Sequence, residues 1–400
     1  MPDLSNRFRS IVPEGENDGW EVHFAAFARK NAGEDILMVS IGDHEFPTPG
    51  ETVEACVREV RAGHHHYTEL AGMPALREAV ATMTAAATGV ETTGANVLAT
   101  IGGQAALFAA LHGTLDPGGH GIMVSPYYVT YPGVFNATGA SHSVVEAKAE
   151  NGFQPDPADI AAAIRPNTRV LLINSPNNPT GAVYSRETLE AIAAICRDHD
   201  LWLISDEVYW THTGPTHPHV TPRSLDGMAE RTLVVNSLSK SHGMTGWRVG
   251  WLVAPEAFVR LGTNFNLIST YGLNDFVSRA AIEAIDNGWG VERIAGLYER
   301  RRETFLAAVR GINAITVRGS EGGMYLMLDI RQVADSGRKF AWGLLDEEKM
   351  AVMPGESFGH AAAGHIRISL CQNDDLLEEA ATRLKRFVSN RLADGKAVAS

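Results

Sequence analysis

Short, almost wholly apolar runs alternate with stretches of helical periodicity through the middle of the chain. The runs cover residues 97–101, 121–125, 143–146, 169–174, 202–205, 233–237 and 249–253, and helical patterns between them include 104–114, 185–199 and 255–269. Several of the runs lack an apolar/polar alternation, which is typical of strands covered on both faces. The pattern predicts an α/β fold with a mainly parallel sheet flanked by helices. In such sheets ligands bind at the carboxyl ends of the strands.

The two ends of the chain read differently from the middle. Residues 1–48 contain one apolar run, 36–41, followed by a Pro-rich turn. An Arg-rich helix is expected over 297–310, strand-like pieces at 324–330 and 366–370, and a closing helix over 374–393. We predict that residues 1–48 and 295–400 form one smaller α+β domain, and that 49–294 form the large ligand-binding domain. No Ser/Gly linker separates the two, so we expect them to pack tightly.

Composition excludes several classes of protein. Of the 400 residues 44% are hydrophobic, enough for a large core, and the formal net charge of −13 argues against a nucleic-acid partner. Three distant cysteines exclude a disulfide scaffold and the common zinc patterns, so we expect no metal and a reducing, cytoplasmic location. We see no signal peptide, and no apolar run approaches the length of a membrane span.

The segment from Ser237 to Gly250 is the most informative in the sequence. It reads Ser-Leu-Ser-Lys-Ser-His-Gly-Met-Thr-Gly-Trp-Arg-Val-Gly and directly follows an apolar run, so Lys240 is expected at the end of a strand. A lysine that is desolvated there has a lowered pKa and becomes a nucleophilic amine. Arg248, together with Ser237 and Ser239, could form a phosphate site beside that amine. An isolated lysine would more often be a solvated surface residue.

This pattern, Ser-x-Ser-Lys followed by Gly-x-Arg-x-Gly, resembles the lysine signature of class I aminotransferases, the aspartate-aminotransferase-like branch of pyridoxal-phosphate (PLP) enzymes. Three further matches follow other apolar runs in the order that the family has: Ser175-Pro-Asn-Asn178-Pro-Thr-Gly181, Ser205-Asp206-Glu-Val-Tyr209 and Thr100-Ile-Gly102-Gly103-Gln104. Taken singly they would read as a Pro/Gly turn, a helix cap and a packing glycine. The resemblance covers roughly residues 20 to 390 and implies the PLP-dependent transferase fold.

The resemblance implies a role for each matched residue. Lys240 forms the Schiff base with PLP and then moves a proton, Asp206 pairs with the ring nitrogen, and Asn178 and Tyr209 reach the phenolic oxygen. The phosphate is held at the helix N-terminus that begins near Gly103. The expected cofactor contacts are Tyr67, Gly103, Gln104, Tyr128, Asn178, Asp206, Tyr209, Ser237, Ser239, Lys240 and Arg248.

The substrate contacts implied by the family are fewer. Arg367, in the alternating stretch 365–369, matches the arginine that grips the α-carboxylate, and Gly42 matches the glycine that leaves room for it. Asn178 completes this set, and Trp20 could cover an apolar or long substrate side chain. One departure is His44, where the family usually has proline, so the electrostatics at the pocket mouth need not follow the family.

The implied activity is transfer of an amino group from an L-amino acid to a 2-oxo acid, pyruvate or 2-oxoglutarate, by a ping-pong mechanism. Several segments are similar to bacterial arginine–pyruvate transaminases, and a basic donor would need an acidic partner such as Glu14, Glu16 or Asp18. Arg260 and Arg279 are candidates by type for a dicarboxylate site. A PLP-dependent lyase acting on C–S bonds, and more remotely a PLP-binding regulator, remain alternatives.

The resemblance also bears on assembly and on the backbone. Tyr67 matches a tyrosine that reaches the phosphate of the neighbouring subunit, which implies a homodimer with shared active sites. Cis peptides are implied at Ser125–Pro126 and at Asn178–Pro179.

Overall fold

The computed structural model describes residues 2–12, 19–312 and 314–393. A seven-stranded sheet forms its centre, in the order β2-β8-β7-β6-β5-β3-β4. The strands are β2 (Val97–Thr100), β3 (His120–Ser125), β4 (Ser141–Glu146), β5 (Thr168–Asn174), β6 (Trp202–Asp206), β7 (Thr232–Ser237) and β8 (Gly250–Val253). Only the pairings that involve β8 are antiparallel. The predicted α/β fold with a mainly parallel sheet is confirmed.

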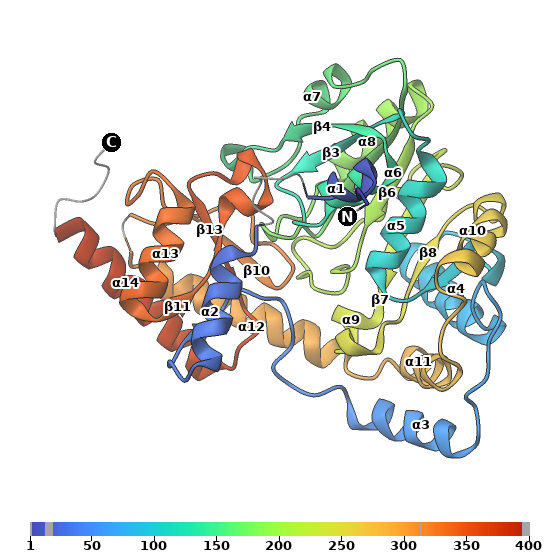
Figure 1. Cartoon of the computed structure of the whole chain (residues 1–400), viewed down its shortest axis with the longest axis horizontal. Helices are drawn as coiled ribbons and strands as arrows, with labels where there is room; N and C mark the ends of the chain where they lie inside the picture. Colours follow the sequence, from blue (N-terminus) through green and yellow to red (C-terminus); the bar gives the residue numbers. More distant parts are fainter. Residues whose placement is uncertain (1, 13–18, 313, 394–400) are drawn as a thin grey trace.

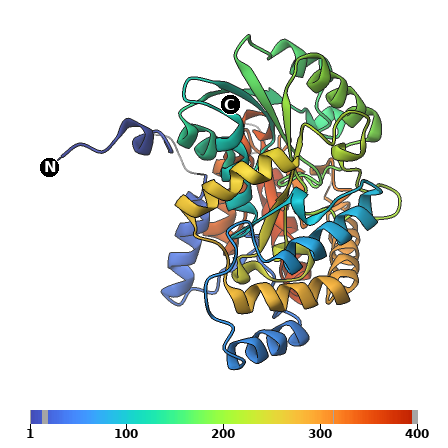
Figure 2. The same ribbon diagram turned by 90° about the vertical axis from the view of Figure 1, so that its right-hand side faces the viewer.

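Helices cover both faces of this sheet (Figures 1 and 2). They are α4 (Pro74–Thr88), α5 (Gly103–Thr114), α6 (Tyr131–Thr138), α7 (Pro157–Ala162), α8 (Arg186–Asp198), α9 (Leu238–Ser241), α10 (Glu256–Ser269) and α11 (Asp275–Asn287). Helix α3 (Gly50–Arg61) packs against α11, away from the sheet. Local sequence sets several of their ends. The Ser185 side chain accepts a hydrogen bond from the Thr188 amide and caps α8, whereas Pro74 begins α4 and Gly89, with φ +70°, ends it.

Both ends of the chain together form a second part of the fold, with two small sheets and their helices (Figure 1). Strand β1 (Leu37–Met38) pairs in parallel with β11 (Met350–Ala351), and an antiparallel sheet has the order β12-β13-β10-β9. Its strands are β9 (Thr316–Val317), β10 (Tyr325–Asp329), β12 (Met353–Pro354) and β13 (His365–Ser369). The helices here are α2 (Glu21–Asn31), α12 (Val291–Val309), α13 (Gly337–Glu348) and α14 (Asp374–Ala393), while the short α1 (Asn6–Arg9) lies against α6.

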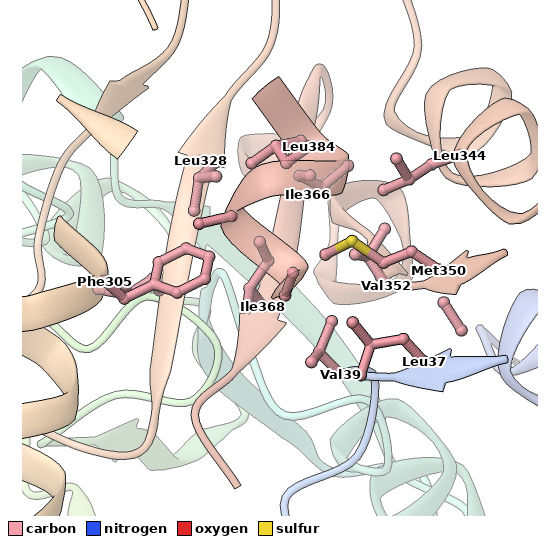
Figure 3. Close-up of a cluster of buried hydrophobic side chains, with 14 of the residues drawn as sticks. Leu37, Val39, Phe305, Leu328, Leu344, Met350, Val352, Ile366, Ile368 and Leu384 are labelled. Atoms are coloured by element: carbon pink, nitrogen blue, oxygen red, sulfur yellow. The ribbon is translucent and has the colours of Figure 1, made fainter. Parts of the chain in front are cut away.

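The hydrophobic core of this second part joins residues that are more than 300 positions apart. Figure 3 shows Leu37 and Val39 packed beside Met350, Val352 and other apolar side chains from the C-terminal third of the chain. The cluster also includes Tyr209, which lies three residues after the end of β6 in the large sheet. Burial of both ends in one cluster fixes the N-terminal segment against β13, and that contact places residues 40–42 beside the large sheet. None of the described helices is both long and apolar enough to span a membrane.

Candidate active site

A cavity of about 310 Å³ opens at the carboxyl ends of β5, β6 and β7. These strands are parallel and in register, so that Asn174 and Asp206 are paired residues, and Ser237 ends the next strand. Thirteen of the fourteen site residues expected from the sequence line this one cavity: Trp20, Gly42, Gly103, Gln104, Tyr128, Asn178, Asp206, Tyr209, Ser237, Ser239, Lys240, Arg248 and Arg367. The fourteenth, Tyr67, lies outside it.

Lys240 lies on α9, the single helical turn that follows β7. The hydroxyl of Ser237 accepts a hydrogen bond from the Ser239 amide at 3.3 Å, which starts this turn and aims Lys240 into the cavity. The Lys240 amine donates to the carbonyl oxygen of Gly42 at 2.6 Å. Burial lowers the pKa of this amine, and the positive charges of Arg367 and Arg248 act in the same direction. A lysine in this setting is a neutral nucleophile for a larger fraction of the time than a solvated one.

Asp206 is a buried acid at the end of β6. Its Oδ2 accepts a hydrogen bond of 2.6 Å from the Tyr131 hydroxyl, and its Oδ1 accepts one of 3.2 Å from the Val208 amide. Burial nevertheless raises the pKa of Asp206 to about 6. Within the described residues no lysine, arginine or histidine forms an ion pair with it. A cation placed beside this carboxylate would therefore satisfy a buried charge that the chain leaves unpaired.

Backbone amides and one arginine make the opposite end of the cavity suitable for an anion. Helix α5 begins at Gly103 without a side-chain cap, so its first amides remain available. The guanidinium of Arg248 lies so close to Gly102 that a Cβ there would be 2.3 Å from Nη2. A Cβ on Gly250 would be 2.4 Å from the carbonyl carbon of Gly102. Both glycines therefore permit the close packing that brings Arg248 to the helix N-terminus.

Arg367 lies on β13 of the antiparallel sheet and extends its side chain into the cavity, where several groups contact the guanidinium. Its Nη1 donates to Asn178 Oδ1 at 2.9 Å and its Nη2 to the carbonyl oxygen of Ser40, while Nε has no partner among the described residues. The guanidinium lies 4.3 Å from the centre of the Tyr325 ring and 4.7 Å from that of Phe358. This stacking fixes the plane of a fork that suits a carboxylate.

Several lining or supporting residues were not expected from the sequence. Tyr325 bonds Tyr209 through the two hydroxyls, 3.2 Å apart, and Tyr131 bonds Asp206. Asp43 and Thr245 line the mouth, where the Thr245 hydroxyl donates to Asp43 Oδ1 at 2.8 Å. Tyr131 begins α6 three positions after Tyr128, and their rings make an edge contact with centres 5.9 Å apart, so its only signal in the sequence is its closeness to Tyr128. Tyr325 carries no local signal, because only the packing of the two sheets brings it to the site.

Some expectations need correction. The cis peptides are Ser125–Pro126, as expected, and Ser175–Pro176, so the cis bond implied at Asn178–Pro179 is wrong. His44 does not line the cavity: its Nε2 donates to the Ser239 carbonyl at 3.2 Å and its Nδ1 meets the Tyr298 hydroxyl at 2.8 Å. Burial beside Lys240 lowers the pKa of His44 to about 4, so this ring adds no charge near neutral pH.

The surroundings of the remaining expected residues are as follows. Tyr67 is 86% exposed and makes an edge contact with Tyr271, with ring centres 5.1 Å apart. The space beside Gly42 is taken by Tyr325, whose hydroxyl would be 1.7 Å from a Cβ. Arg279 pairs with Asp275, and Arg260 lines a different hollow, so neither contributes to the cavity. Glu14, Glu16 and Asp18 lie outside the described residues.

Comparison with known proteins agrees with this geometry. The model of the family described as "Aminotransferase class I and II" matches residues 34–384. The arginine–pyruvate transaminase AruH of Pseudomonas aeruginosa is 41% identical over 94% of this chain and 97% of its own, and the aspartate/prephenate aminotransferase of Thermus thermophilus is 35% identical over 97% and 99%. The solved structure of Thermus thermophilus aspartate aminotransferase with maleate superposes with a TM-score of 0.91 at 34% identity, covering 97% of this chain and 100% of that one.

Proposed function

The chain belongs to the class I and II aminotransferases, enzymes that move an amino group from an amino acid to a 2-oxo acid, and on that premise we propose that it works with PLP and takes a basic L-amino acid as donor. The observation that carries the proposal is that Lys240, Asp206 and Arg367 line one cavity. Their side chains supply an amine, an unpaired acid and a carboxylate-binding fork. These three groups are what the reaction needs around the α-carbon of a substrate.

The donor set of the cavity fits PLP. Bound PLP supplies an electron sink for the negative charge that develops at the α-carbon. Asp206, buried without a cationic partner among the described residues, suits a protonated ring nitrogen. The amides at the start of α5, with Gln104, Ser237, Ser239 and Arg248, suit a phosphate at the other end. Tyr128, Asn178 and Tyr209 lie between these ends and would hold the ring.

Lys240 is the group that we assign to proton transfer. Its amine lies within hydrogen-bond distance of Gly42, and burial lowers its pKa, so that it is unprotonated more often than a solvated lysine and better able to accept a proton. Arg367 is assigned to the substrate α-carboxylate. Because its guanidinium plane is fixed between two rings, a bound carboxylate is oriented, and the α-hydrogen is turned in one direction. Gly42 and Asn178 border the same space.

The cavity favours a basic donor over a dicarboxylate. Of the described residues that line it, the cations are Lys240, Arg248 and Arg367, and each already has an assigned partner. The carboxylate of Asp43 at the mouth has no such assignment and can pair with a guanidinium or ammonium group. The similarity to an arginine–pyruvate transaminase agrees with this choice. Aspartate is the second candidate donor, supported by the similar aspartate aminotransferases. Pyruvate and 2-oxoglutarate are the candidate acceptors.

The reaction type is tested by adding single amino acids and then a 2-oxo acid to the purified holoenzyme. We expect the visible band of bound PLP to bleach with the donor and to return with pyruvate or 2-oxoglutarate. Release of pyruvate and ammonia without an acceptor would instead identify a lyase. Absence of a PLP band after cofactor is added would contradict the cofactor assignment, and a PLP band without any turnover would favour a binding protein.

The donor class is tested with L-arginine and its neutral analogue L-citrulline. We expect kcat/KM to be at least about tenfold higher for arginine, because the uncharged analogue cannot form the ion pair with Asp43. Asp43→Asn keeps an oxygen for the Thr245 hydroxyl and should abolish that preference while leaving citrulline unchanged. Equal kcat/KM values in the wild-type enzyme would exclude a basic donor. Faster turnover of L-aspartate would point to the second candidate.

Assembly and organisation form the last part of the proposal. We propose a homodimer in which Tyr67 of one chain completes the site of the other, because the side chain is exposed and lies outside its own chain's cavity. We also propose that residues 49–294 act as the large domain and that 1–48 with 295–400 act as the small one. All three cysteines are free thiols, which agrees with the cytoplasmic location expected from the sequence.

A further inference from the structure

A second cavity, of about 300 Å³, lies across the large sheet from the candidate active site. Successive residues of a strand point to opposite faces, and the two cavities divide neighbouring residues between them. Asp206 lines the first and Glu207 the second, while on β7 Ser237 lines the first and Asn236 the second. The far wall is the C-terminal half of α4 and the loop that follows Trp210. This cavity has no part in the proposed transamination.

The second cavity contains a buried cation without an ionic partner. Arg223 is only 4% exposed, and its Nη1 and Nη2 donate to neutral oxygens, the Thr92 hydroxyl at 2.9 Å and the Glu91 carbonyl at 3.4 Å. In the described part of the chain no carboxylate forms an ion pair with it, and its Nε has no hydrogen-bond partner. Buried charges in proteins are normally paired. An anionic ligand would supply the missing partner.

Burial lowers the pKa of Arg223, and the charge of the neighbouring carboxylate, Glu207, opposes this only in part. Glu207 forms no ion pair with Arg223, because its oxygens accept from other groups. Glu207 accepts hydrogen bonds from the hydroxyls of Ser205 and Thr221 and from Nε2 of His219, at 2.8–2.9 Å. The other ring nitrogen of His219, Nδ1, is buried without a partner among the described residues. Nδ1 of His219 is therefore a second polar atom in this cavity for which the described residues supply no partner.

The rest of the lining combines apolar side chains with the polar residues Thr84, Thr88, Arg186, Ser224 and Asn236. Met83, Trp210, Val234, Trp251 and Val253 provide aromatic and aliphatic walls. A pocket with such walls and a few buried polar groups is the usual form of a small-molecule site. We propose that this cavity is a second binding site, which takes a small organic carboxylate with an apolar body. The carboxylate would lie on Arg223, beside His219, and the body between α4 and the sheet.

The test uses the holoenzyme and 4-bromobenzoate as the probe. The uncharged 4-bromobenzamide, which has nearly the same shape, is the control. Because Arg367 can bind the same probe, the two cavities are separated by variants on α4. Ala87 is exposed and lines the second cavity, whereas Ala86 is exposed on the same helix and does not line it. In calorimetric titrations we expect Ala87→Trp to bind one molecule fewer per chain than Ala86→Trp and wild type. We expect both variants to retain transaminase activity, which would show that they fold.

Two further measurements locate the probe and test its charge. The anomalous signal of bromine in soaked crystals should place one molecule beside Arg223, and Arg223→Gln should weaken that site by about tenfold or more. The benzamide should bind there at least about tenfold more weakly than the benzoate. Equal numbers of bound molecules in the two α4 variants, no bromine in the cavity, or bromine there without a calorimetric difference (binding at crystal concentration only) would each overturn the proposal.

Discussion

The hydroxyl of Tyr131 donates a 2.6 Å hydrogen bond to Oδ2 of Asp206. The tyrosine begins α6 and the aspartate ends β6, so the bond joins two elements that sit 75 residues apart in the sequence. It opposes the effect of burial, because a donor stabilises the charged carboxylate and lowers its pKa. Burial is the larger effect, and the pKa of Asp206 remains raised, at about 6.

Tyr131→Phe removes this donor without changing the shape of the side chain. We expect the pKa of Asp206 to rise further and the affinity for PLP to fall by about 10- to 100-fold, the range for a hydrogen bond to a charged group. The dissociation constant of the cofactor, measured by spectroscopic titration after its removal, checks this. Tyr184→Phe alters another buried tyrosine and should leave that constant unchanged. An equal fall in both variants would mean that the loss is one of stability and not of the bond.

Asp206 should also make the cofactor-free protein less stable as the pH rises. Its pKa is raised from 3.8 in an unfolded chain to about 6, so the folded state holds the proton more tightly. The resulting stability is complete below about pH 4 and is lost as the pH rises through 6, on the order of 3 kcal/mol in total. The Asp206→Asn variant has no carboxyl group at this position, so its stability does not fall over this pH range for that reason. Its melting temperature should therefore exceed that of the wild type at pH 7.5 but not at pH 4, and a constant difference would contradict the assignment.

The local motifs allowed much of the site to be predicted, and tertiary packing determined the rest. Lys240, Asp206 and Asn178 each follow an apolar run, and parallel strands bring such residues to one edge. Tyr325 and Ser40 carry no such signal, because they reach the site only when the antiparallel sheet packs on the large one. The sequence motif contains two X–Pro bonds, Ser175–Pro176 and Asn178–Pro179, and both are typical of turns. The sequence does not indicate which of them is cis, and the structure has the cis bond at Ser175–Pro176.

Arg367→Lys should weaken the binding of both substrates while sparing the cofactor. A lysine cannot reproduce the planar fork held between Tyr325 and Phe358. We expect kcat/KM to fall by about 100-fold or more for donor and acceptor alike. Arg302→Lys is the matched control, since Arg302 is also buried but does not line the cavity. Unchanged kcat/KM in the Arg367 variant would show that the α-carboxylate binds elsewhere.

Gly42→Ala should disturb the same fork indirectly. The added Cβ would lie 1.7 Å from the Tyr325 hydroxyl and 2.6 Å from its ring carbon Cζ, so the ring that stacks on Arg367 must move. We expect KM for the amino donor to rise by about tenfold or more. Gly50→Ala, where nothing lies within 4 Å of a Cβ, should leave KM unchanged. A Gly42 variant with wild-type KM would mean that Tyr325 does not position Arg367.

The shared site is tested by mixing two inactive or weakened chains. Tyr67→Phe should weaken PLP binding, and Lys240→Ala should abolish turnover. If Tyr67 serves the partner's site, a mixed dimer contains one site with neither substitution. That site binds PLP with wild-type affinity, and the mixed dimer has about half of the wild-type activity. If Tyr67 serves its own chain, no such site forms. Activity of the mixture that equals the average of the two parents would contradict shared sites.

Side chains alternate between the two faces of the sheet at the ends of β6 and β7, so both cavities depend on the register of these strands. Asp206, the last residue of β6, lines the first cavity, and Glu207, which directly follows the strand, lines the second; Ser237 and Asn236 divide in the same way at the end of β7. A slip of either strand by a single residue would exchange these faces, sending the active-site acid into the rear cavity and its neighbour into the front. An insertion or deletion within β6 would thus erase both pockets at once, however small the change in the rest of the fold. The two cavities therefore depend on the same strand register, and neither can be kept if that register changes.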